Sequence, residues 1–288
     1  MKHYFLMTNR SKDPDLKITN QICDYLISKG CSCTIHNNHK PSEHDGIIHI
    51  DDYELPSDTE CVITLGGDGT LIQVAHDVAK RECAVIGVNL GKLGYLAEIE
   101  KDAIIPTLDR LMKDDFKIEE RMMLYGIPYV DKMPVKKQFA LNDVVITRSG
   151  PLRLMTLHIF VNDRLLKTYG ADGIIVSTPT GSTGYNLSAG GPIVEPGSSV
   201  VVLTPVNAHT LNARSIILSP EDDIKVVIGE GRRESKETAE VYFDGASVTK
   251  LQTGDYVQIT KAKEHTRIIK MSKENFLDVL RRKLTDME

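Results

Sequence analysis

The sequence predicts an α/β domain followed by a β-rich domain. Over the first ~110 residues, strand patterns alternate with helix patterns, which is typical of a mostly parallel sheet. From about residue 116 onward, short β-rich runs recur with Gly, Pro or Asp between them, which is typical of a β-sandwich or a similar unit. The domains are therefore expected over residues 1–115 and 116–255, with a separate C-terminal segment over 256–288.

The elements of the first domain follow from apolar runs and helical spacing. Short apolar runs predict strands at 3–7, 34–36, 61–65 and 84–88. A helix is predicted over 15–29, because apolar residues from Ile18 to Leu26 fall on one face and Gly30 follows as a C-cap. Further helices are predicted from about Thr70 and over 101–113.

The second domain is predicted from β-rich runs separated by turn residues. These runs cover 138–147, 152–161, 165–177, 199–205, 215–218, 224–228 and 239–243. An exposed hairpin tip is expected over 230–238. In the C-terminal segment, 256–260 and 267–270 are predicted as strands, and the spacing from Phe276 to Leu284 predicts a closing helix.

Composition excludes several classes of protein. The 288 residues are 41% hydrophobic and 26% charged, which is ordinary for a globule with a real core. The net charge of −5 provides no basic field for nucleic acid or an anionic membrane, and no apolar stretch approaches the ~20 residues of a membrane span. Five cysteines do not suggest a disulfide framework. The expected compartment is the cytoplasm.

The most informative segment is a run of small and hydroxyl residues after a short apolar strand. It reads DGIIVSTPTGSTGYNLSAGGPIV over 172–194. Small residues let a ligand approach the backbone closely, and hydroxyls offer hydrogen bonds at little steric cost. Tyr185, the one aromatic in the run, can stack on a flat ring. The run predicts a binding surface for a polar, sugar-like and partly aromatic ligand.

A second motif indicates what happens to that ligand. The sequence GGDGT at 66–70 joins a buried-strand run to a helical pattern. A helix N-terminus favours phosphate, yet Asp68 would repel it. The carboxylate makes sense there if it takes a proton from a hydroxyl or helps to hold a metal ion. The alternative is a purely structural turn.

Two other loops carry candidate binding residues. The loop over 86–99 is rich in Gly but departs from a Walker loop, because it is one residue short and Leu93 stands in place of Ser or Thr. Asn142 and Asp143 follow the predicted strand at 138–141; an amide can pair with an adenine edge, and a carboxylate can accept from a ribose diol. The plainer alternatives are a packing loop and an Asx turn, respectively.

The cysteines and histidines between Cys31 and His49 do not match a structural zinc site. Their spacings differ from the Cys pairs and His pairs that such sites use. The alternation of Cys31 and Cys33 with polar residues favours one face of a strand, followed by a solvated loop. Zinc is therefore expected to be absent.

Four segments together resemble the NAD kinase family. They are GGDGT at 66–70, GVNLGKLGYLAEI at 87–99, LNDVVITR at 141–148 and the run at 172–194, and they lie in the order that the family shows. The resemblance implies transfer of the γ-phosphoryl group of a nucleoside triphosphate, or of polyphosphate, to the adenosine 2′-hydroxyl of NAD, giving NADP. It also implies a Rossmann-like N-terminal domain, a β-sandwich-like C-terminal domain and a chain end that returns to the first domain, with an active site between the domains.

The resemblance implies roles for residues that match these motifs. Asp68 is expected to be catalytic, either as the base or as the group that orients the hydroxyl, with the rest of its turn near the phosphates. The expected substrate-binding residues are Gly66, Gly67, Gly69, Thr70, Asn142, Asp143, Asp172, Thr183, Gly184, Tyr185 and Ser188. Mg²⁺ is expected to accompany ATP, without a dedicated protein metal site.

The chain departs from the family pattern at three positions. Many relatives carry Arg where this chain has Gly170, and Glu where it has Asp143. Gln is frequent at the position of Ala246. Arg148, Lys92 or a neighbouring subunit can supply the cation missing at Gly170, and a homodimer or homotetramer is expected.

Two alternatives remain on sequence grounds. A lipid or sugar kinase shares the GGDGT turn, although residues 177–184 are nearly all polar or small and offer little to acyl chains. A non-catalytic dinucleotide-binding regulator would not need Asp68. The expected partners are NAD, ATP and further copies of the chain, whereas nucleic acid and membrane are not expected.

Overall fold

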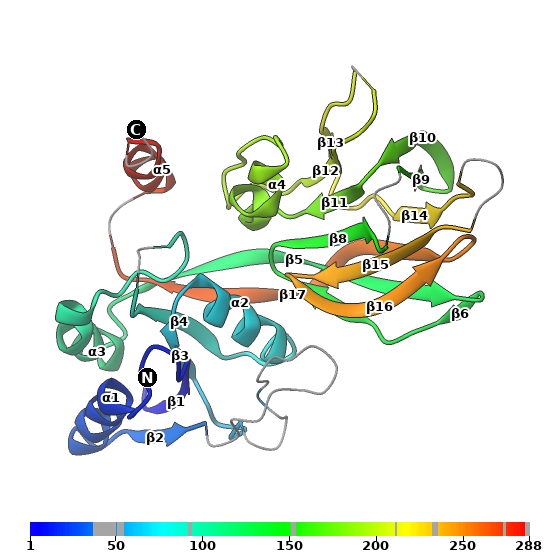
Figure 1. The fold of residues 1–288 in the computed structure, drawn as a ribbon. Helices are drawn as coiled ribbons and strands as arrows, with labels where there is room; N and C mark the ends of the chain where they lie inside the picture. The colour runs from blue at the N-terminus through cyan, green and yellow to red at the C-terminus, as the bar shows by residue number, and fades with distance from the viewer. Residues whose placement is uncertain are drawn as a thin grey trace. The chain divides into compact units, whose positions relative to one another are not determined.

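The fold was analysed in a computed structural model of the chain. It describes residues 1–36, 50, 55–91, 94–150, 154–210, 212–231, 236–272 and 275–285, except for the side chains of 246–248 and 284. The described chain forms two compact units, whose elements are labelled in Figure 1. The first unit contains the described residues up to Arg121 and those from Thr266 onward, and the second contains those from Met122 to His265.

Parallel strands form the sheet of the first unit. Across the sheet, the order is the end of β17 (Tyr256–Lys270), β4 (Ala84–Asn89), β3 (Cys61–Gly66), β1 (His3–Thr8) and β2 (Ser32–Ile35). Each of these neighbouring pairs is parallel. All residues of β3 and β4 are buried, which explains why both read as continuous apolar runs.

Helices add buried apolar residues to the first unit. They are α1 (Lys17–Ser28), α2 (Asp68–Asp77) and α3 (Ile104–Met112, after the 3₁₀ turn Lys101–Ala103). In α5 (Phe276–Thr285), none of the described residues is buried. Ile22 and Leu26 of α1 and Leu108 of α3 are buried in one cluster with strand residues such as Ile63. None of the helices in the described ranges is long and apolar enough to cross a membrane.

The second unit contains two sheets. One has the antiparallel order β13 (Ile216–Leu218), β12 (Val201–Val206), β11 (Gly173–Ser177), β8 (Asp143–Arg148), β15 (Thr238–Phe243) and β16 (Ala246–Gln252). The other has the order β10 (Arg164–Ala171), β9 (Met155–Val161), β14 (Ile224–Ile228) and the start of β17. β5 (Lys117–Val130) pairs with β17, β6 (Met133–Pro134) and β7 (Gln138–Ala140).

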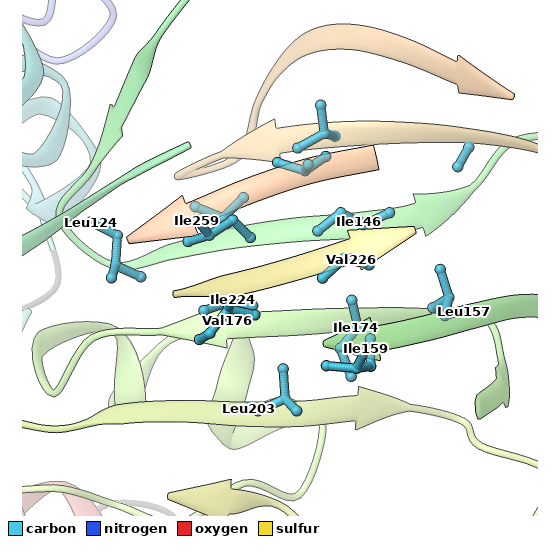
Figure 2. Close-up of a cluster of buried hydrophobic side chains, with 14 of the residues drawn as sticks. Leu124, Ile146, Leu157, Ile159, Ile174, Val176, Leu203, Ile224, Val226 and Ile259 are labelled. Carbon is cyan, nitrogen blue, oxygen red and sulfur yellow. The ribbon is translucent and has the colours of Figure 1, made fainter. Parts of the chain in front are cut away.

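The core of the second unit is built from alternate residues of both sheets. Ile174 and Val176 of β11 belong to the same buried cluster as Ile159 of β9 and Val226 of β14, and Figure 2 shows these side chains together. β14 alternates buried and half-buried residues along its length, as a strand with one face toward a core should. The predicted fold class, an α/β unit and a β-sandwich-like unit with the chain end returning to the first, is confirmed.

Several element boundaries differ from the sequence-based prediction. β5 and β16 were not predicted, although Asp244-Gly245 before β16 is a hairpin signal. Residues 138–147 and 165–177 each divide into two strands, since the chain breaks pairing before Asp143 and at Asp172. The two strands predicted between 256 and 270 are one strand, β17. The small-residue run contains a 3₁₀ turn, η2 (Thr180–Thr183), and a short helix, α4 (Tyr185–Ser188).

Candidate active site

The GGDGT motif forms the junction of β3 and α2 in the first unit. Gly66 ends β3, Gly67 is the N-cap of α2, and Asp68 begins the helix. A Cβ atom on Gly66 would overlap the side chain of Thr70, which is itself buried. Gly69 is exposed, with open space where a side chain would stand. The backbone on either side of Asp68 is therefore tightly packed at Gly66 and Thr70 and open at Gly69.

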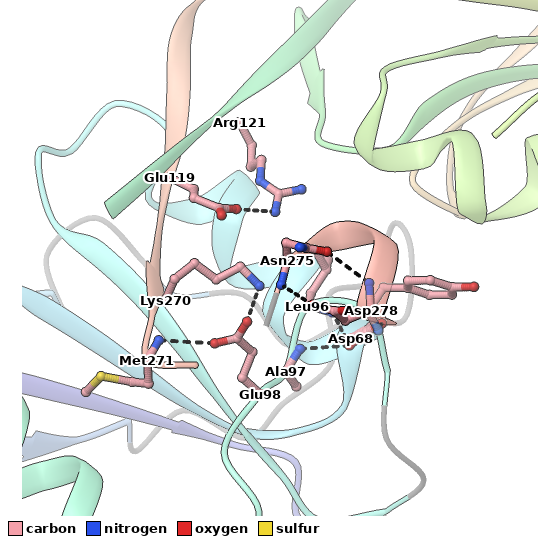
Figure 3. A network of polar contacts seen from close by, with 11 residues as sticks. Asp68, Leu96, Ala97, Glu98, Glu119, Arg121, Lys270, Met271, Asn275 and Asp278 are labelled. Carbon is pink, nitrogen blue, oxygen red and sulfur yellow. Dashed lines mark hydrogen bonds and ion pairs between the residues drawn. The ribbon is translucent and has the colours of Figure 1, made fainter. Parts of the chain in front are cut away.

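Three backbone amides hold the carboxylate of Asp68. Its Oδ2 accepts from Tyr95 N at 2.6 Å, and its Oδ1 accepts from Leu96 N at 3.2 Å and Ala97 N at 3.0 Å. Figure 3 shows the contacts with Leu96 and Ala97. A Cβ on Gly94 would overlap the Asp68 carboxylate, so this close approach requires glycine. Because a carboxylate offers about four lone-pair sites, about one remains for a substrate group.

The segment that carries these amides is fixed from two sides. Ile99 N donates to Gly87 O at 3.1 Å, and Asn89 N donates to Ile99 O at 2.8 Å. Glu98 forms an ion pair with Lys270 at the end of β17, where both side chains are largely buried (Figure 3). We call residues 94–98 the amide segment.

The pKa of Tyr95 reflects the nearby Asp68 carboxylate. Burial raises the pKa of its phenol, and the nearby Asp68 charge raises that pKa further. The ammonium of Lys283, on α5, lies 5.5 Å from the centre of the Tyr95 ring. The amide segment is thus in contact with the C-terminal helix of the same unit.

The second unit contains a pocket of about 400 Å³. It is lined by Asn142, Asp143, Val145, Thr147, Tyr185, Tyr242, Asp244 and Gly245. Three residues of the predicted substrate site, Asn142, Asp143 and Tyr185, meet here although the last is distant in sequence from the others. The pocket lining therefore combines a side-chain amide, a carboxyl group and an aromatic ring.

Asp244 fixes the backbone of the residues that line this pocket. Its carboxylate accepts three backbone N–H bonds, from Leu141 at 2.7 Å and from Asn142 and Asp143 at 2.8 Å each. Asp244 has a φ of 50°, and Gly245 after it has a φ of 86°, as a tight hairpin between β15 and β16 requires. Sequence reasoning did not assign Asp244 a role; the Asp-Gly hairpin signal could have located the turn but not its contact.

Two groups in the pocket are unusual: the side-chain oxygen of Asn142 has no hydrogen-bond partner among the described residues, and the carboxyl group of Asp143 has a raised pKa. The Oδ1 atom of Asn142 is buried without a hydrogen bond to any described residue. Asp143 is 4% exposed, and burial together with the neighbouring Asp244 charge raises its pKa to about 8. At neutral pH the Asp143 carboxyl group therefore carries a proton and can donate a hydrogen bond as well as accept one. Both groups are suited to meeting a polar ligand.

The rest of the small-residue run positions Tyr185. Asn186 is fully buried: its Nδ2 donates to Ser182 O and Pro192 O at 3.0 Å each, and its Oδ1 accepts from Thr204 Oγ1 at 2.7 Å. Gly181 lies against the Asn142 carbonyl so closely that a Cβ would overlap it. Tyr185 itself is 47% exposed. Much of the run is thus structural, and the aromatic ring is left at the pocket.

The other predicted residues lie outside the pocket lining. Thr183 donates to Thr180 O at 3.3 Å, Gly184 joins η2 to α4 close to the Asn142 amide, and Ser188 is exposed at the end of α4. Asp172 lies between β10 and β11, in the same unit.

Asp172 is paired within the chain. Arg148 Nε donates to its Oδ1 at 2.8 Å and Asn207 Nδ2 to its Oδ2 at 3.0 Å, and these two hydrogen bonds lower the pKa of Asp172. Gly170 has open space at its Cβ position, so a Cβ atom there would meet no neighbour. Of the cations considered as substitutes, Arg148 is committed to Asp172, and Lys92 lies outside the described residues.

The described residues contain no group of three or more His, Cys, Asp or Glu side chains arranged to hold a metal ion. Cys31, Cys33 and His36 are among them, whereas His39, His44 and His49 lie outside the described ranges. A further residue that the sequence analysis missed is Lys12, whose ammonium lies 3.4 Å from Gly66 O.

Comparison with known proteins places these motifs in a family. The model of the ATP-NAD kinase N-terminal domain matches residues 6–116, and that of the C-terminal domain matches residues 141–271. The chain is 42% identical to the NAD kinase of Agathobacter rectalis over 284 residues, covering 99% of both chains. It is 41% identical to the NAD kinase of Lachnospira eligens over 293 residues, covering 99% of this chain and 100% of that one.

Solved structures share the fold at lower identity. A yeast NADH kinase complexed with NADH superposes with a TM-score of 0.82 at 21% identity, covering 99% of this chain and 88% of that one. An NAD kinase from Archaeoglobus fulgidus in complex with ATP gives a TM-score of 0.71 at 21% identity, covering 94% of each chain. With both domain models matched and close relatives similar over their full length, the chain belongs to the NAD kinase family.

Proposed function

We propose that this chain transfers the γ-phosphoryl group of ATP to the adenosine 2′-hydroxyl of NAD, giving NADP and ADP. The observation that carries the proposal is the state of Asp68: a carboxylate fixed by three amides, with about one acceptor site left open, at a Gly-rich turn. A carboxylate held in this way can accept a hydrogen bond from one hydroxyl group. Phosphoryl transfer depends chiefly on such positioning and on electrostatics.

We assign the adenosine part of NAD to the pocket of the second unit. The unpartnered Oδ1 of Asn142 can accept from an exocyclic amine, as an Asn amide does at an adenine edge. Tyr185 offers an exposed ring on which a base can stack. Asp143, protonated at neutral pH, can donate to a ribose or base acceptor. Thr183, Gly184, Ser188 and Asp172 are assigned to the rest of the dinucleotide on the family resemblance.

In the reaction, the 2′-oxygen attacks the γ-phosphorus while the bond from that phosphorus to the β,γ-bridging oxygen breaks. Asp68 orients the 2′-hydroxyl and is the proton acceptor within reach as the new P–O bond forms. Gly66, Gly67, Gly69 and Thr70 form the turn near the transferred phosphate, where the N-terminus of α2 favours negative charge.

Mg²⁺ fits as a companion of the nucleotide rather than as a resident of the protein. Three of the acceptor positions of Asp68 are already used, and the described residues form no metal-binding cluster. Mg²⁺ commonly binds through substrate phosphates, waters and at most one or two carboxylates, rather than in a site made of protein groups alone. It would neutralise charge on the transferring group. We further propose a cytoplasmic enzyme that assembles as a homodimer or homotetramer.

The alternative acceptors fit this chain less well. A lipid kinase needs an apolar pocket for acyl chains, whereas this pocket is lined by Asn142, Asp143 and Asp244 among others. A non-catalytic dinucleotide-binding regulator gives no reason for the amide segment to enclose Asp68.

Incubation with NAD, ATP and Mg²⁺, followed by chromatography and mass measurement of the nucleotides, tests the proposal. We expect NADP, with phosphorus NMR placing the new phosphate on the 2′-oxygen. Parallel reactions replace NAD with diacylglycerol and ATP with polyphosphate, which separates the acceptor class from the donor class. Binding of NAD without any phosphorylated product would instead favour the regulator.

A further inference from the structure

Lys12 places a cation beside the GGDGT turn. It belongs to the connection between β1 and α1, and its Nζ donates to Gly66 O at 3.4 Å. A Cβ atom on Gly67 or on Gly91 would lie 3.1 Å from this Nζ, so both glycines leave room for the ammonium. The segments that follow β1, β3 and β4 thus lie close to the Lys12 ammonium, at the carboxyl ends of parallel strands. This is the edge at which open α/β sheets bind ligands.

The backbone around Lys12 is fixed rather than loose. Asn9 N donates to Leu65 O at 2.8 Å, which ties the connection to the end of β3. Lys12 N donates to Asn9 O at 2.9 Å and closes a turn. Asp13 is tied to the first turn of α1, with Oδ2 accepting from Thr19 N at 2.9 Å. The backbone position from which the exposed Lys12 side chain extends is therefore fixed by neighbours on both sides.

Two acidic residues of these segments, Asp13 and Asp68, are engaged with other groups. The Asp13 carboxylate accepts from Thr19 N, Thr19 Oγ1 and Ile18 N, and the Asp68 carboxylate accepts from the amide segment. Within the described ranges, Lys12 takes part in none of the salt bridges. Its ammonium has three donor hydrogens and, among the residues that the structure describes, one neutral carbonyl partner, which leaves two donors for a ligand.

We propose that Lys12 binds phosphate oxygens of the triphosphate donor and is a catalytic residue of this enzyme. The inference rests on the proposed function, because it concerns the same phosphate region. The chain has a net charge of −5 and no Walker lysine, and the negative charge of the Asp68 carboxylate at the turn disfavours a polyanion. Lys12 offsets that charge at the turn itself, and its ammonium stabilises the negative charge that phosphoryl transfer spreads over the oxygens.

The test compares Lys12→Met and Lys12→Arg with Lys113→Met, which removes an exposed lysine of the same unit. Calorimetry measures binding of ATP and of inorganic tripolyphosphate, and separately of NAD, to each full-length protein. For Lys12→Met we expect about 10–100-fold weaker binding of both phosphate ligands, the factor for one lost charge-assisted hydrogen bond, with NAD binding unchanged. Lys12→Arg should recover part of the affinity, and Lys113→Met should match the parent.

Steady-state kinetics provide an independent readout. For Lys12→Met, kcat/KM for ATP should fall at least as much as ATP affinity, while KM for NAD and the melting temperature stay near parental values. Equal losses for ATP and NAD together with a lower melting temperature would mean a structural role and overturn the proposal. Unchanged ATP and tripolyphosphate binding would overturn it as well.

Failure of the proposed function can be told apart from failure of this inference. If the parent binds ATP but makes no NADP, the function proposal fails, and the loss of ATP binding in Lys12→Met still supports the assignment of Lys12. If the parent binds neither ATP nor tripolyphosphate, the assignment of Lys12 is wrong.

Discussion

At the scale of single residues, the backbone amides that contact Asp68 allow us to predict how Asp68→Asn changes kcat and NAD affinity. Asp68→Asn removes the charge and puts an N–H₂ group where one oxygen accepts an amide hydrogen bond. We expect kcat to fall by roughly 10²–10⁴, the usual contribution of a general base, with NAD affinity retained because the proposed NAD pocket lies in the other unit.

Steady-state assays and calorimetry with NAD check this expectation. Asp102→Asn, at an exposed position of the same unit, is the control and should match the parent. A near-normal kcat in Asp68→Asn would exclude a catalytic role. Recovery of kcat at high Mg²⁺ would favour metal positioning over proton transfer.

The raised pKa of Asp143 predicts a pH dependence of stability. Its pKa is about 8 in the folded chain and 3.8 in the ordinary state, so between these values the folded protein holds a proton that the unfolded chain has released. Stability contributed by this group therefore decreases as pH rises from about 4 to 8. Asp143→Asn removes the titration. We expect its melting temperature, relative to the parent, to be higher at pH 8.5 than at pH 5.5.

Asp172→Asn is the matched control for this experiment. The pKa of Asp172 is lowered by Arg148 and Asn207, so its stabilising charge is present above its ordinary pKa and is lost only as pH falls into the acid range. Its effect should be the same at pH 5.5 and pH 8.5. An equal effect of Asp143→Asn at both pH values would show that Asp143 is ionised throughout this range.

At the scale of elements, the ion pair of Glu98 with Lys270 joins the amide segment to β17. Both side chains are about 15% exposed, and Glu98 also accepts from Met271 N at 3.2 Å (Figure 3). Glu98→Gln leaves a largely buried ammonium beside a neutral amide. We expect a loss of about 1–3 kcal/mol in the free energy of unfolding, and a lower kcat because the amides that orient Asp68 are less well fixed.

Urea unfolding and kinetics measure the two effects. Asp163→Asn disrupts an ion pair with Lys225 in which Asp163 is 90% exposed, and it should cost far less stability. Lost stability with an unchanged kcat would show that the pair supports the fold but not the position of Asp68.

At the scale of the whole molecule, we expect a homodimer or homotetramer. Leu165 on β10 and Ile217 on β13 are each 57% exposed, and each strand ends a sheet of the second unit. Edge strands with apolar side chains are prone to pair with another chain. Light scattering across the concentrations used for assays should give a multiple of the 32.0 kDa chain mass. A fully active monomer would contradict this expectation.

Local patterns in the sequence were sufficient for the architecture. Alternating apolar runs and helical spacing predicted the parallel sheet of the first unit, because buried parallel strands such as β3 and β4 are apolar along their whole length. Strands with weaker patterns escaped prediction. β5 begins with exposed charged residues and contains Gly126 and Pro128, so its apolar alternation is interrupted.

The motifs also identified the family and proposed the residues of the site, but their contacts came only from the tertiary structure. Sequence reasoning treated Asp68 as an open carboxylate, whereas amides from Tyr95 to Ala97 enclose it. It gave no role to Asp244, which contacts backbone about a hundred residues away, or to Lys12, which lies at the turn after β3. Periodicity and motif spacing report which residues face a core or form a turn. Which distant side chain meets which backbone group is decided when the strands pair, and that step sets the charge and hydrogen bonding of the site.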